Sequence, residues 1–252
     1  GPHAGSIEDM WQVSIEIASR AGGDPGRTGL MGPMTTPSPV KPERLIVLET
    51  KGWAKLDDAS RSAFEQLLDN LQRAGVKLLR RADHSAVEAL EASVSNATQV
   101  TTTITAWENH WNHRNLIDRI PDGVSERIKA TLARAEAMTP DDYRQLLLER
   151  EMARQAHTAL APLADAVVTL SCPGPAPLWL GDTPGEPLAA RPTGDAVFNY
   201  PSSMLGAPVV TVPMMAVGGM PVGLQVMGQA HEDARVTALA RWIHQSVQPV
   251  AV

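Results

Sequence analysis

The sequence predicts an α/β protein with a mixed β-sheet flanked by helices. Two observations carry this prediction. Short apolar runs alternate along the chain with longer segments whose apolar residues recur at helical spacing. A strand, a helix and a second strand also follow one another within residues 44–80, which is typical of a β-α-β unit with parallel strands.

The first eighty residues predict two helices and two strands. Ser6 followed by Asp9 is typical of a helix start, because a serine side chain accepts a backbone N–H and early acids complement the helix dipole. Asp57 is a second capping residue of this kind. The expected elements are a helix over 7–21, an irregular crossing over 22–42, a strand over 44–49, a helix from 57 to about 75 and a strand over 76–80.

The middle of the chain predicts helices alone. We expect residues 84–163 to form a helical insertion within a single domain that covers 1–252. The clearest start is at 139–142, where a capping Thr is followed by Pro and two acids. A run of three threonines at 101–103 weakens the helical pattern. The expected helices cover 86–116, 125–138 and 139–163.

The last ninety residues predict strands, turns and one helix. Pro208 and Pro213 bracket an apolar run, and proline cannot donate a ladder hydrogen bond, so we expect the strand to end at them. Gly218 and Gly219 favour a tight turn. The expected elements are strands over 165–170, 208–213 and 222–227, a loop over 171–193 and a helix over 232–245.

Composition indicates a soluble protein that binds neither nucleic acid nor membrane. The formal net charge of −6 provides no excess of Lys and Arg for phosphate contacts. No apolar run approaches the roughly 18 residues that cross a bilayer. The single cysteine, Cys172, excludes an internal disulfide and favours a cytoplasmic location. Residue 1 is Gly and lies close to a helix start, so we expect a piece of a longer protein or a removed tag.

Three groups of side chains are candidate reactive residues. His110 and His113 share a helix face, but two histidines do not complete a metal site, and partly exposed helix histidines are the alternative. Cys172 follows a strand, as catalytic groups often do, yet a small buried residue is the alternative. Ser202 and Ser203 are candidate nucleophiles; the alternative is that they start a short helix and cap its free N–H groups.

Aromatic residues and glycines give two further indications. Trp107 and Trp111 lie four residues apart and are expected either to line one face of a pocket or to pack in the core; Trp179 is a third candidate. The glycines form no phosphate-binding pattern. We therefore expect no nucleotide, metal or organic cofactor.

Three segments resemble the amidase signature family. GPHAGSIEDMWQ is similar to its G-P-x-A-x-S-x-x-D segment, and TPDDYRQLLLEREMAR with LADAVVTLSCPGPAPL is similar to its long helix, strand and loop. TGDAVFNYPSSMLGAPVVTVP with GGMPVGLQVMG resembles its C-terminal pattern. The resemblance covers about residues 1–247 but only the family's C-terminal part.

The resemblance implies a hydrolase that cleaves carboxamide C–N bonds with a nucleophilic serine, a bridging serine in a cis peptide and a lysine. Those residues lie upstream of the segment that opens this chain, so we expect no catalytic residue here and no amidase activity from this chain alone. By resemblance, the stretch from Asp195 to Ser203 is a substrate-side wall. Asp195 would hold a donor, Phe198 would supply an apolar face, and Asn199 would both donate and accept; capping and turn formation remain the alternative for Asp195 and Asn199.

The resemblance further implies a small-molecule amide substrate. A second copy and a partner of the amidotransferase type are the two candidate protein partners, and a free hydrolase is the alternative. Trp107, Trp111 and Trp179 are secondary candidates for the wall. Two other hypotheses remain open at this point. One is a non-catalytic binding or partner module built on half of the fold, and the other is a hydrolase that depends on Cys172.

Overall fold

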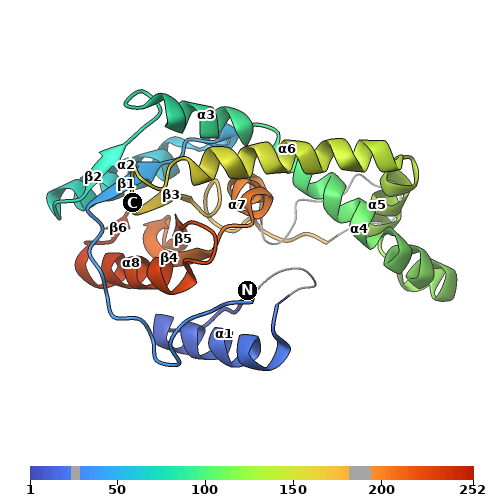
Figure 1. Cartoon of the computed structure of the whole chain (residues 1–252), viewed down its shortest axis with the longest axis horizontal. Helices are drawn as coiled ribbons and strands as arrows, with labels where there is room; N and C mark the ends of the chain where they lie inside the picture. Colours follow the sequence, from blue (N-terminus) through green and yellow to red (C-terminus); the bar gives the residue numbers. More distant parts are fainter. Residues whose placement is uncertain (24–28, 182–193) are drawn as a thin grey trace.

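The computed structural model describes residues 1–23, 29–181 and 194–252, and these residues form a mixed sheet. Its strands are β1 (Arg44–Val47), β2 (Lys77–Leu79), β3 (Ala166–Leu170), β4 (Val209–Val217), β5 (Met220–Met227) and β6 (Val250–Ala251). The order across the sheet is β2-β1-β3-β5-β4-β6 (Figure 1). Strand β1 is parallel to β2 and β3, β4 is parallel to β6, and β5 is antiparallel to β3 and β4. The predicted fold class is confirmed.

Side-chain caps define where several helices begin. Ser6 accepts from the backbone N–H of Asp9 at 3.0 Å, and Asp57 accepts from that of Ser60 at 2.6 Å. Thr139 and Asp142 cap one another's backbone N–H groups, so the predicted starts are confirmed. The helices of the described residues are α1 (Ile7–Ala21), α2 (Asp58–Arg73), α3 (Ser85–Ser93), α4 (Ala97–Arg119), α5 (Glu126–Glu136), α6 (Pro140–Thr158), α7 (Asn199–Leu205) and α8 (Asp233–Ser246), with 3-10 turns η1 (Lys51–Lys55), η2 (Pro121–Gly123) and η3 (Ala196–Phe198).

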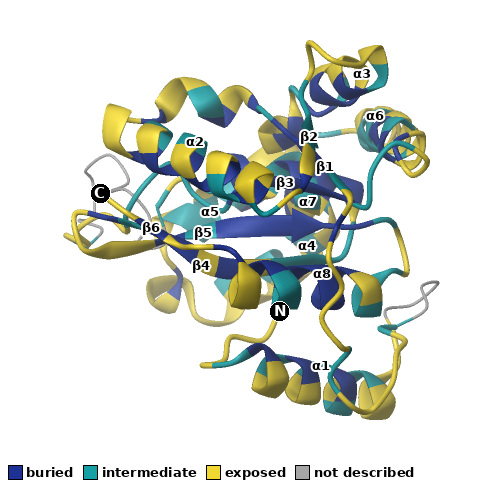
Figure 2. Ribbon diagram, turned by 90° about the vertical axis from the view of Figure 1, so that its left-hand side faces the viewer, coloured by how far each residue is buried: buried dark blue, intermediate teal, exposed yellow. Residues whose placement is uncertain are grey.

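Successive side chains along β1 point to opposite faces of the sheet, and both faces are apolar. Leu45 and Val47 face one side and Ile46 and Leu48 the other, and all four are fully buried. Helices α2 and α8 cover the first face, whereas α3, α4, α6 and α7 cover the second. Figure 2 shows β5 buried between these layers, with the exposed residues on the outer helix surfaces. The core therefore lies on both faces of the sheet.

The helical region between β2 and β3 differs from the expected pattern most clearly in its first helix. The helix expected over 86–116 is two helices, α3 and α4, separated at 94–96, where Ser95 and Asn96 are residues that compete with helical backbone bonds. The threonine run does not interrupt α4, and the Thr102 hydroxyl donates to the carbonyl of Thr98 at 2.8 Å within the helix. Helices α4 and α5 pack together and protrude from the body (Figure 1).

Strand β4 continues past the proline that was expected to end it. The register between β4 and β5 shifts between Val212 and Met215, so Pro213 lies at an irregularity in the ladder. A proline is tolerated there because no N–H is required of it. The expectation was therefore wrong at this end of the strand. The glycine turn is confirmed, with positive φ angles of 56° at Gly218 and 77° at Gly219.

Helix α1 lies outside the two covering layers, on the far side of α8 (Figures 1 and 2). Trp11 is almost fully buried, and its indole N–H donates to the carbonyl of Pro33 at 3.0 Å. Gly32 is required beneath the ring, since a Cβ there would lie 2.7 Å from Trp11. None of the described helices is long and apolar enough to span a membrane.

Candidate active site

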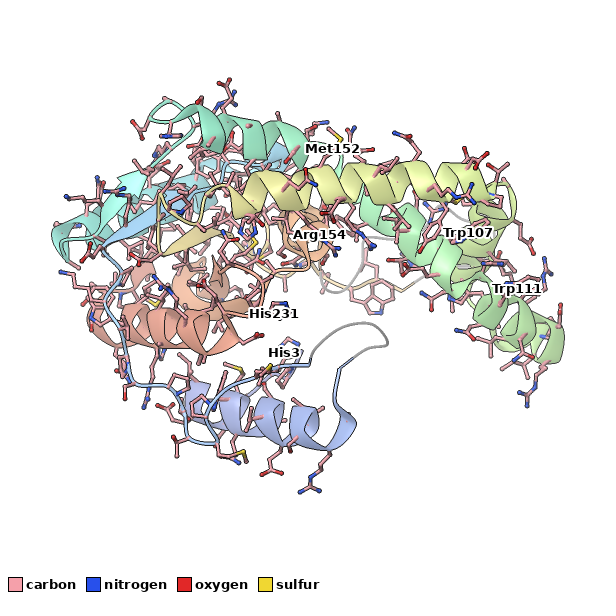
Figure 3. All side chains as sticks on the ribbon, viewed as in Figure 1. His3, Trp107, Trp111, Met152, Arg154 and His231 are labelled. Atoms are coloured by element: carbon pink, nitrogen blue, oxygen red, sulfur yellow. The ribbon has the colours of Figure 1, made fainter. Side chains whose placement is uncertain are left out.

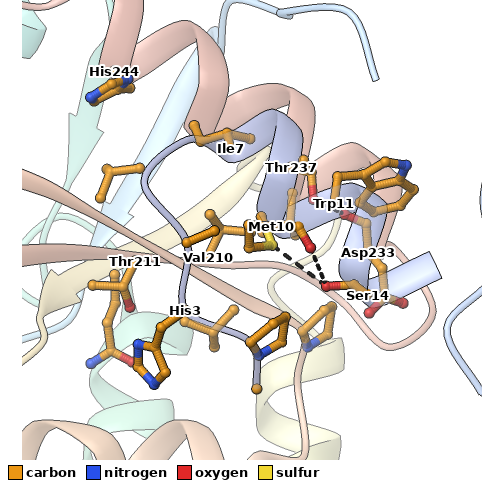
Figure 4. A pocket seen from close by; sticks show the side chains of 18 of the residues that line it. His3, Ile7, Met10, Trp11, Ser14, Val210, Thr211, Asp233, Thr237 and His244 are labelled. Carbon is orange, nitrogen blue, oxygen red and sulfur yellow. Dashed lines mark hydrogen bonds between the residues drawn. The ribbon is translucent and has the colours of Figure 1, made fainter. Parts of the chain in front are cut away.

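A cleft of about 700 Å³ opens between the N-terminal segment and the edge of the sheet. Its walls come from residues 1–7, α1, α7, β4 and α8. Figure 4 shows the side chains around it, with apolar Ile7 and Val210 among polar His3 and Thr211. A cleft that is largely apolar and holds a few polar groups is typical of small-molecule sites.

One wall of this cleft is the first half of β4. Residues Val209–Val212 pair with β5 on one side, while β6 reaches only Met215 and Ala216 on the other. In the part of the chain that the structure describes, the outer edge of Val209–Val212 therefore has no partner strand. Unpaired backbone N–H and C=O groups at such an edge readily accept a further strand.

Asp195 is held by intramolecular contacts. Its Oδ1 accepts from the backbone N–H of Val197 at 3.0 Å and caps η3, and its Oδ2 forms an ion pair with Lys55. The side chain is outside the residues that line the cleft. The structure thus places Asp195 at a turn, where it caps η3 and ties it to the end of η1.

Phe198 lies in the core behind α7. Its side chain is fully buried, and its ring packs so closely on Gly52 of η1 that a Cβ there would lie 2.8 Å from it. Gly52 is therefore required for this packing. In this structure Phe198 positions the segment that follows it, and its ring does not face the cleft.

The start of α7 brings three polar side chains to the cleft: Asn199, Ser202 and Ser203. The alternative to a nucleophilic role, that the serines start a helix and cap its N–H groups, is wrong, because the helix begins at Asn199. Ser202 instead donates its hydroxyl to the carbonyl of Asn199 at 2.9 Å, because it lies one turn inside the helix. Gly206 ends α7 in the left-handed conformation, with φ at 63°.

Gln225 is a buried residue of β5 to which the sequence reasoning gave no role. Its amide donates to the carbonyls of Leu170 at 2.7 Å and Phe198 at 3.0 Å, and its oxygen lies 3.3 Å from the Ser202 hydroxyl. Only 2% of the residue is exposed. The side chain therefore fixes η3 and α7 against the sheet. The sequence does contain a signal for this role, which is a single glutamine among the apolar residues of the strand VGLQVM.

None of the three candidate tryptophans, Trp107, Trp111 and Trp179, is among the residues that line the cleft. Trp107 stacks on Tyr143 of α6 with ring centroids 5.6 Å apart, and Trp111 is 74% exposed. Figure 3 shows both on the α4–α5 arm, away from His3 at the cleft. Trp179 is exposed and lies close in the chain to residues outside the described part.

The other candidate reactive groups are Cys172 and the histidines of α4. Cys172 is half buried against the core, and its Sγ lies 3.5 Å from the hydroxyl of Ser171. His110 contacts the backbone carbonyl of Trp107 through its Nδ1. Within the described ranges, no group of three His, Cys, Asp or Glu could hold a metal ion.

The described lining of the cleft offers hydrogen-bonding side chains, and His3, Asp233 and His244 add titratable groups. Asn199 offers a donor and an acceptor, and the serines offer hydroxyls. No lysine is among the described residues that line the cleft. A serine nucleophile needs a base within hydrogen-bond reach, and the Ser202 proton is directed at a backbone carbonyl.

The fold places the chain in a class of α/β proteins with a mixed central sheet, and solved amidase structures share this fold. A solved structure described as "Crystal structure of amidase" has a TM-score of 0.69 and 25% identity, covering 84% of this chain and 48% of that one. A glutamyl-tRNA(Gln) amidotransferase subunit from Thermotoga maritima has a TM-score of 0.51 and 19% identity, covering 83% of this chain and 43% of that one.

The family model described as Amidase matches residues 1–237, and the chain belongs to this family. A glutamyl-tRNA(Gln) amidotransferase subunit of Pseudothermotoga lettingae is 35% identical over 77 residues, which are 31% of this chain and 16% of that protein. The corresponding mitochondrial protein of Homo sapiens is 34% identical over 59 residues, covering 23% of this chain and 11% of that protein. The chain spans about half the length of the solved amidase structure it matches.

Proposed function

We propose that this chain supplies the substrate-side wall of an amidase-type hydrolase that cleaves linear carboxamides. In this proposal, the serine, bridging serine and lysine of the reaction belong to polypeptide upstream of the 252 residues. In the complete enzyme, serine attack on the carboxamide gives an acyl-enzyme and releases ammonia or an amine, and water completes the hydrolysis.

The observation that carries this proposal is the composition of the cleft. Asn199, Ser202 and Ser203 converge on it beside an unpaired strand edge, yet its described lining contains no lysine. A wall that offers hydrogen-bonding groups but lacks the lysine expected for the reaction fits a site completed by another segment. Two facts support this: the family match covers 1–237, and the chain is about half as long as the solved amidase.

The role of Asn199 follows from its position. Its side chain is exposed at the first turn of α7, and Gln225 holds that helix in place through the carbonyl of Phe198. An amide side chain matches a carboxamide substrate, because each group has one acceptor and one N–H₂ donor. We assign Asn199 to the substrate carboxamide and Asp195 to the position of the η3 turn.

The experiment compares two polypeptides. We expect the 252-residue chain to release no ammonia from propionamide, benzamide or glutamine, and the chain extended by its upstream coding sequence to release it. Glutamine is included because several relatives are amidotransferase subunits. If the extended protein stays inactive, the binding or partner module is favoured. If the short chain is active, the catalytic groups lie within it, and Cys172→Ala tests the thiol first.

A second measurement tests the wall. In the extended enzyme, Asn199→Ala should lower kcat/KM about tenfold or more, as expected for loss of a hydrogen bond to substrate. Asn112→Ala on α4 is the matched control, because that residue is exposed and far along the chain from α7. Equal effects of the two substitutions would contradict the assignment of Asn199.

The proposal includes a location and a protein partner. We place the protein in the cytoplasm, and the partner is either a second copy or a protein of the amidotransferase type. The amidotransferase subunits among the relatives support the second choice. Size-exclusion chromatography of the extended enzyme distinguishes a dimer from a monomer that needs another protein.

A further inference from the structure

A second groove lies where β1, β2 and β3 begin. It measures about 640 Å³ and is lined by residues 41–44, Gly75, Lys77, residues 161–165 and Arg235 of α8. It shares no lining residue with the cleft at α7. We call it the basic groove.

The charge of the basic groove is opposite to that of the whole chain. Four cationic side chains line it, against the two acidic side chains Glu43 and Asp165. The chain as a whole has a formal net charge of −6. The four cationic residues are Lys41, Arg44, Lys77 and Arg235.

Asp165 does not neutralise the lysines, because its carboxylate is occupied. Its Oδ2 accepts from the backbone N–H groups of Glu43 at 2.8 Å and Arg44 at 3.0 Å. Its Oδ1 accepts from the guanidinium of Arg235 at 2.6 Å. Asp165 therefore holds the backbone at Glu43 and Arg44 in place and fixes the guanidinium of Arg235.

Two of the cations are direct neighbours across the sheet. Arg44 of β1 and Lys77 of β2 are register partners in a parallel pair, and neighbouring strands lie about 4.8 Å apart. Like charges opposite one another on the same face destabilise a sheet. Arg44 is held in this position, because its guanidinium donates to the carbonyl of Leu163 at 2.9 Å. A bound anion would remove the repulsion.

The lysines remain available for such an anion. Lys41 lies over the Trp242 ring, 5.7 Å from its centroid, and a Cβ on Gly75 would be 2.9 Å from its Nζ. In the part of the chain that the structure describes, neither Lys41 nor Lys77 forms an ion pair with a carboxylate. The Trp242 ring attracts the Lys41 ammonium, and the absence of a side chain at Gly75 leaves room for the ammonium at the groove.

We propose that the basic groove binds a small multiply charged anion, with Lys41, Arg44 and Lys77 as its contacts. A phosphate group or a set of carboxylates supplies the required charge and acceptor oxygens. This site is separate from the cleft at α7, since none of its lining residues lines that cleft.

Titration calorimetry of the 252-residue protein with inorganic pyrophosphate and with citrate tests the proposal. We expect binding of at least one anion near 0.15 M salt, with pyrophosphate alone indicating a phosphate source and citrate alone a carboxylate source. Lys41→Ala and Lys77→Ala should each weaken it about tenfold. The matched control is Lys129→Ala, which removes the same charge from α5 and should change affinity less than about twofold.

Thermal unfolding gives a second readout. The anion that binds should raise the melting temperature of the native chain and not that of Lys77→Ala, because only a ligand of the folded state stabilises it. Without anion, Lys77→Ala should melt at or above the native chain, since the repulsion with Arg44 is gone. No binding of either anion at millimolar concentration, or equal weakening by Lys77→Ala and Lys129→Ala, would overturn the proposal.

Discussion

His157 lies on the inner side of α6 with 4% of its surface exposed, and within the described residues its Nε2 has no hydrogen-bond partner. Burial lowers the pKa of this imidazole to about 4, from an ordinary value of 6.5. As the pH falls, the imidazole of His157 therefore takes up a proton at a higher pH in the unfolded chain than in the folded chain. Stability that is complete above about pH 6.5 is lost as the pH falls toward 4.

His157→Gln tests this linkage, because glutamine does not titrate in that range. The native chain should lose roughly 2–3 kcal/mol more unfolding free energy between pH 7.5 and 4.5 than the variant loses. Urea unfolding at both pH values measures the difference. His244→Gln, at an exposed position on α8, is the control and should keep the native pH dependence. A variant at 157 with unchanged pH dependence would contradict the buried neutral state.

Gln225→Leu tests the residue that holds α7 on the sheet. The substitution leaves the buried carbonyls of Leu170 and Phe198 without their donor, so the free energy of unfolding should fall by about 2–4 kcal/mol. Urea unfolding checks the value. Gln245→Leu, an exposed position on α8, should change it by less than about 0.5 kcal/mol. Equal losses at the two positions would show that Gln225 has no special role.

At the scale of elements, Gly228 fixes how closely β5 approaches α8. A Cβ at this position would lie 2.1 Å from Cγ2 of Val236, which is fully buried. Gly228→Ala should therefore destabilise the protein by about 1–3 kcal/mol through overpacking. In the double variant with Val236→Ala the cost should be smaller than the sum of the single costs, because the clash is removed. A thermodynamic cycle from urea unfolding measures this coupling, and additive costs would contradict it.

The elements with strong end signals were predicted well from sequence. Ser6, Asp57 and the Thr139 capping box gave the starts of α1, α2 and α6 because a cap is a local interaction. The continuation of β4 past Pro213 could not be predicted, since it depends on an irregular register with β5. The same holds for β6, two residues long, which forms only by pairing with β4.

The residues predicted for the substrate-side wall do not all lie at the cleft. The stretch from Asp195 to Ser203 does reach the cleft through Asn199 and Ser203, whereas Phe198 packs in the core. Spacing in the sequence assigns a residue to a segment, but the direction of its side chain depends on what packs behind that segment. Gly52 and Gln225, both distant in sequence, decide that direction here.

At the scale of the whole molecule, the open edge at the cleft has a consequence for solution behaviour. Val209–Val212 present an unpaired strand edge beside an apolar cleft, among the residues that the structure describes. We expect the isolated chain to bind a hydrophobic dye and to associate as its concentration rises. Dye fluorescence and size-exclusion chromatography measure both.

Thr211→Lys places a charge on this edge and should reduce the association, as lysine does on natural edge strands. Thr105→Lys, at an exposed position on α4, adds the same charge elsewhere and should leave it unchanged. A native chain that stays monomeric and melts cooperatively without binding dye would count against an incomplete site.

The sequence by itself determined the fold class, most helix and strand positions and the family resemblance, because these depend on periodicity and on capping and turn residues that act locally. Tertiary structure alone decided the burial of Phe198, the role of Gln225, the open edge of β4 and the pairing of Arg44 with Lys77. Each of those depends on groups that are distant in the chain and meet only when the sheet assembles and its two faces are packed.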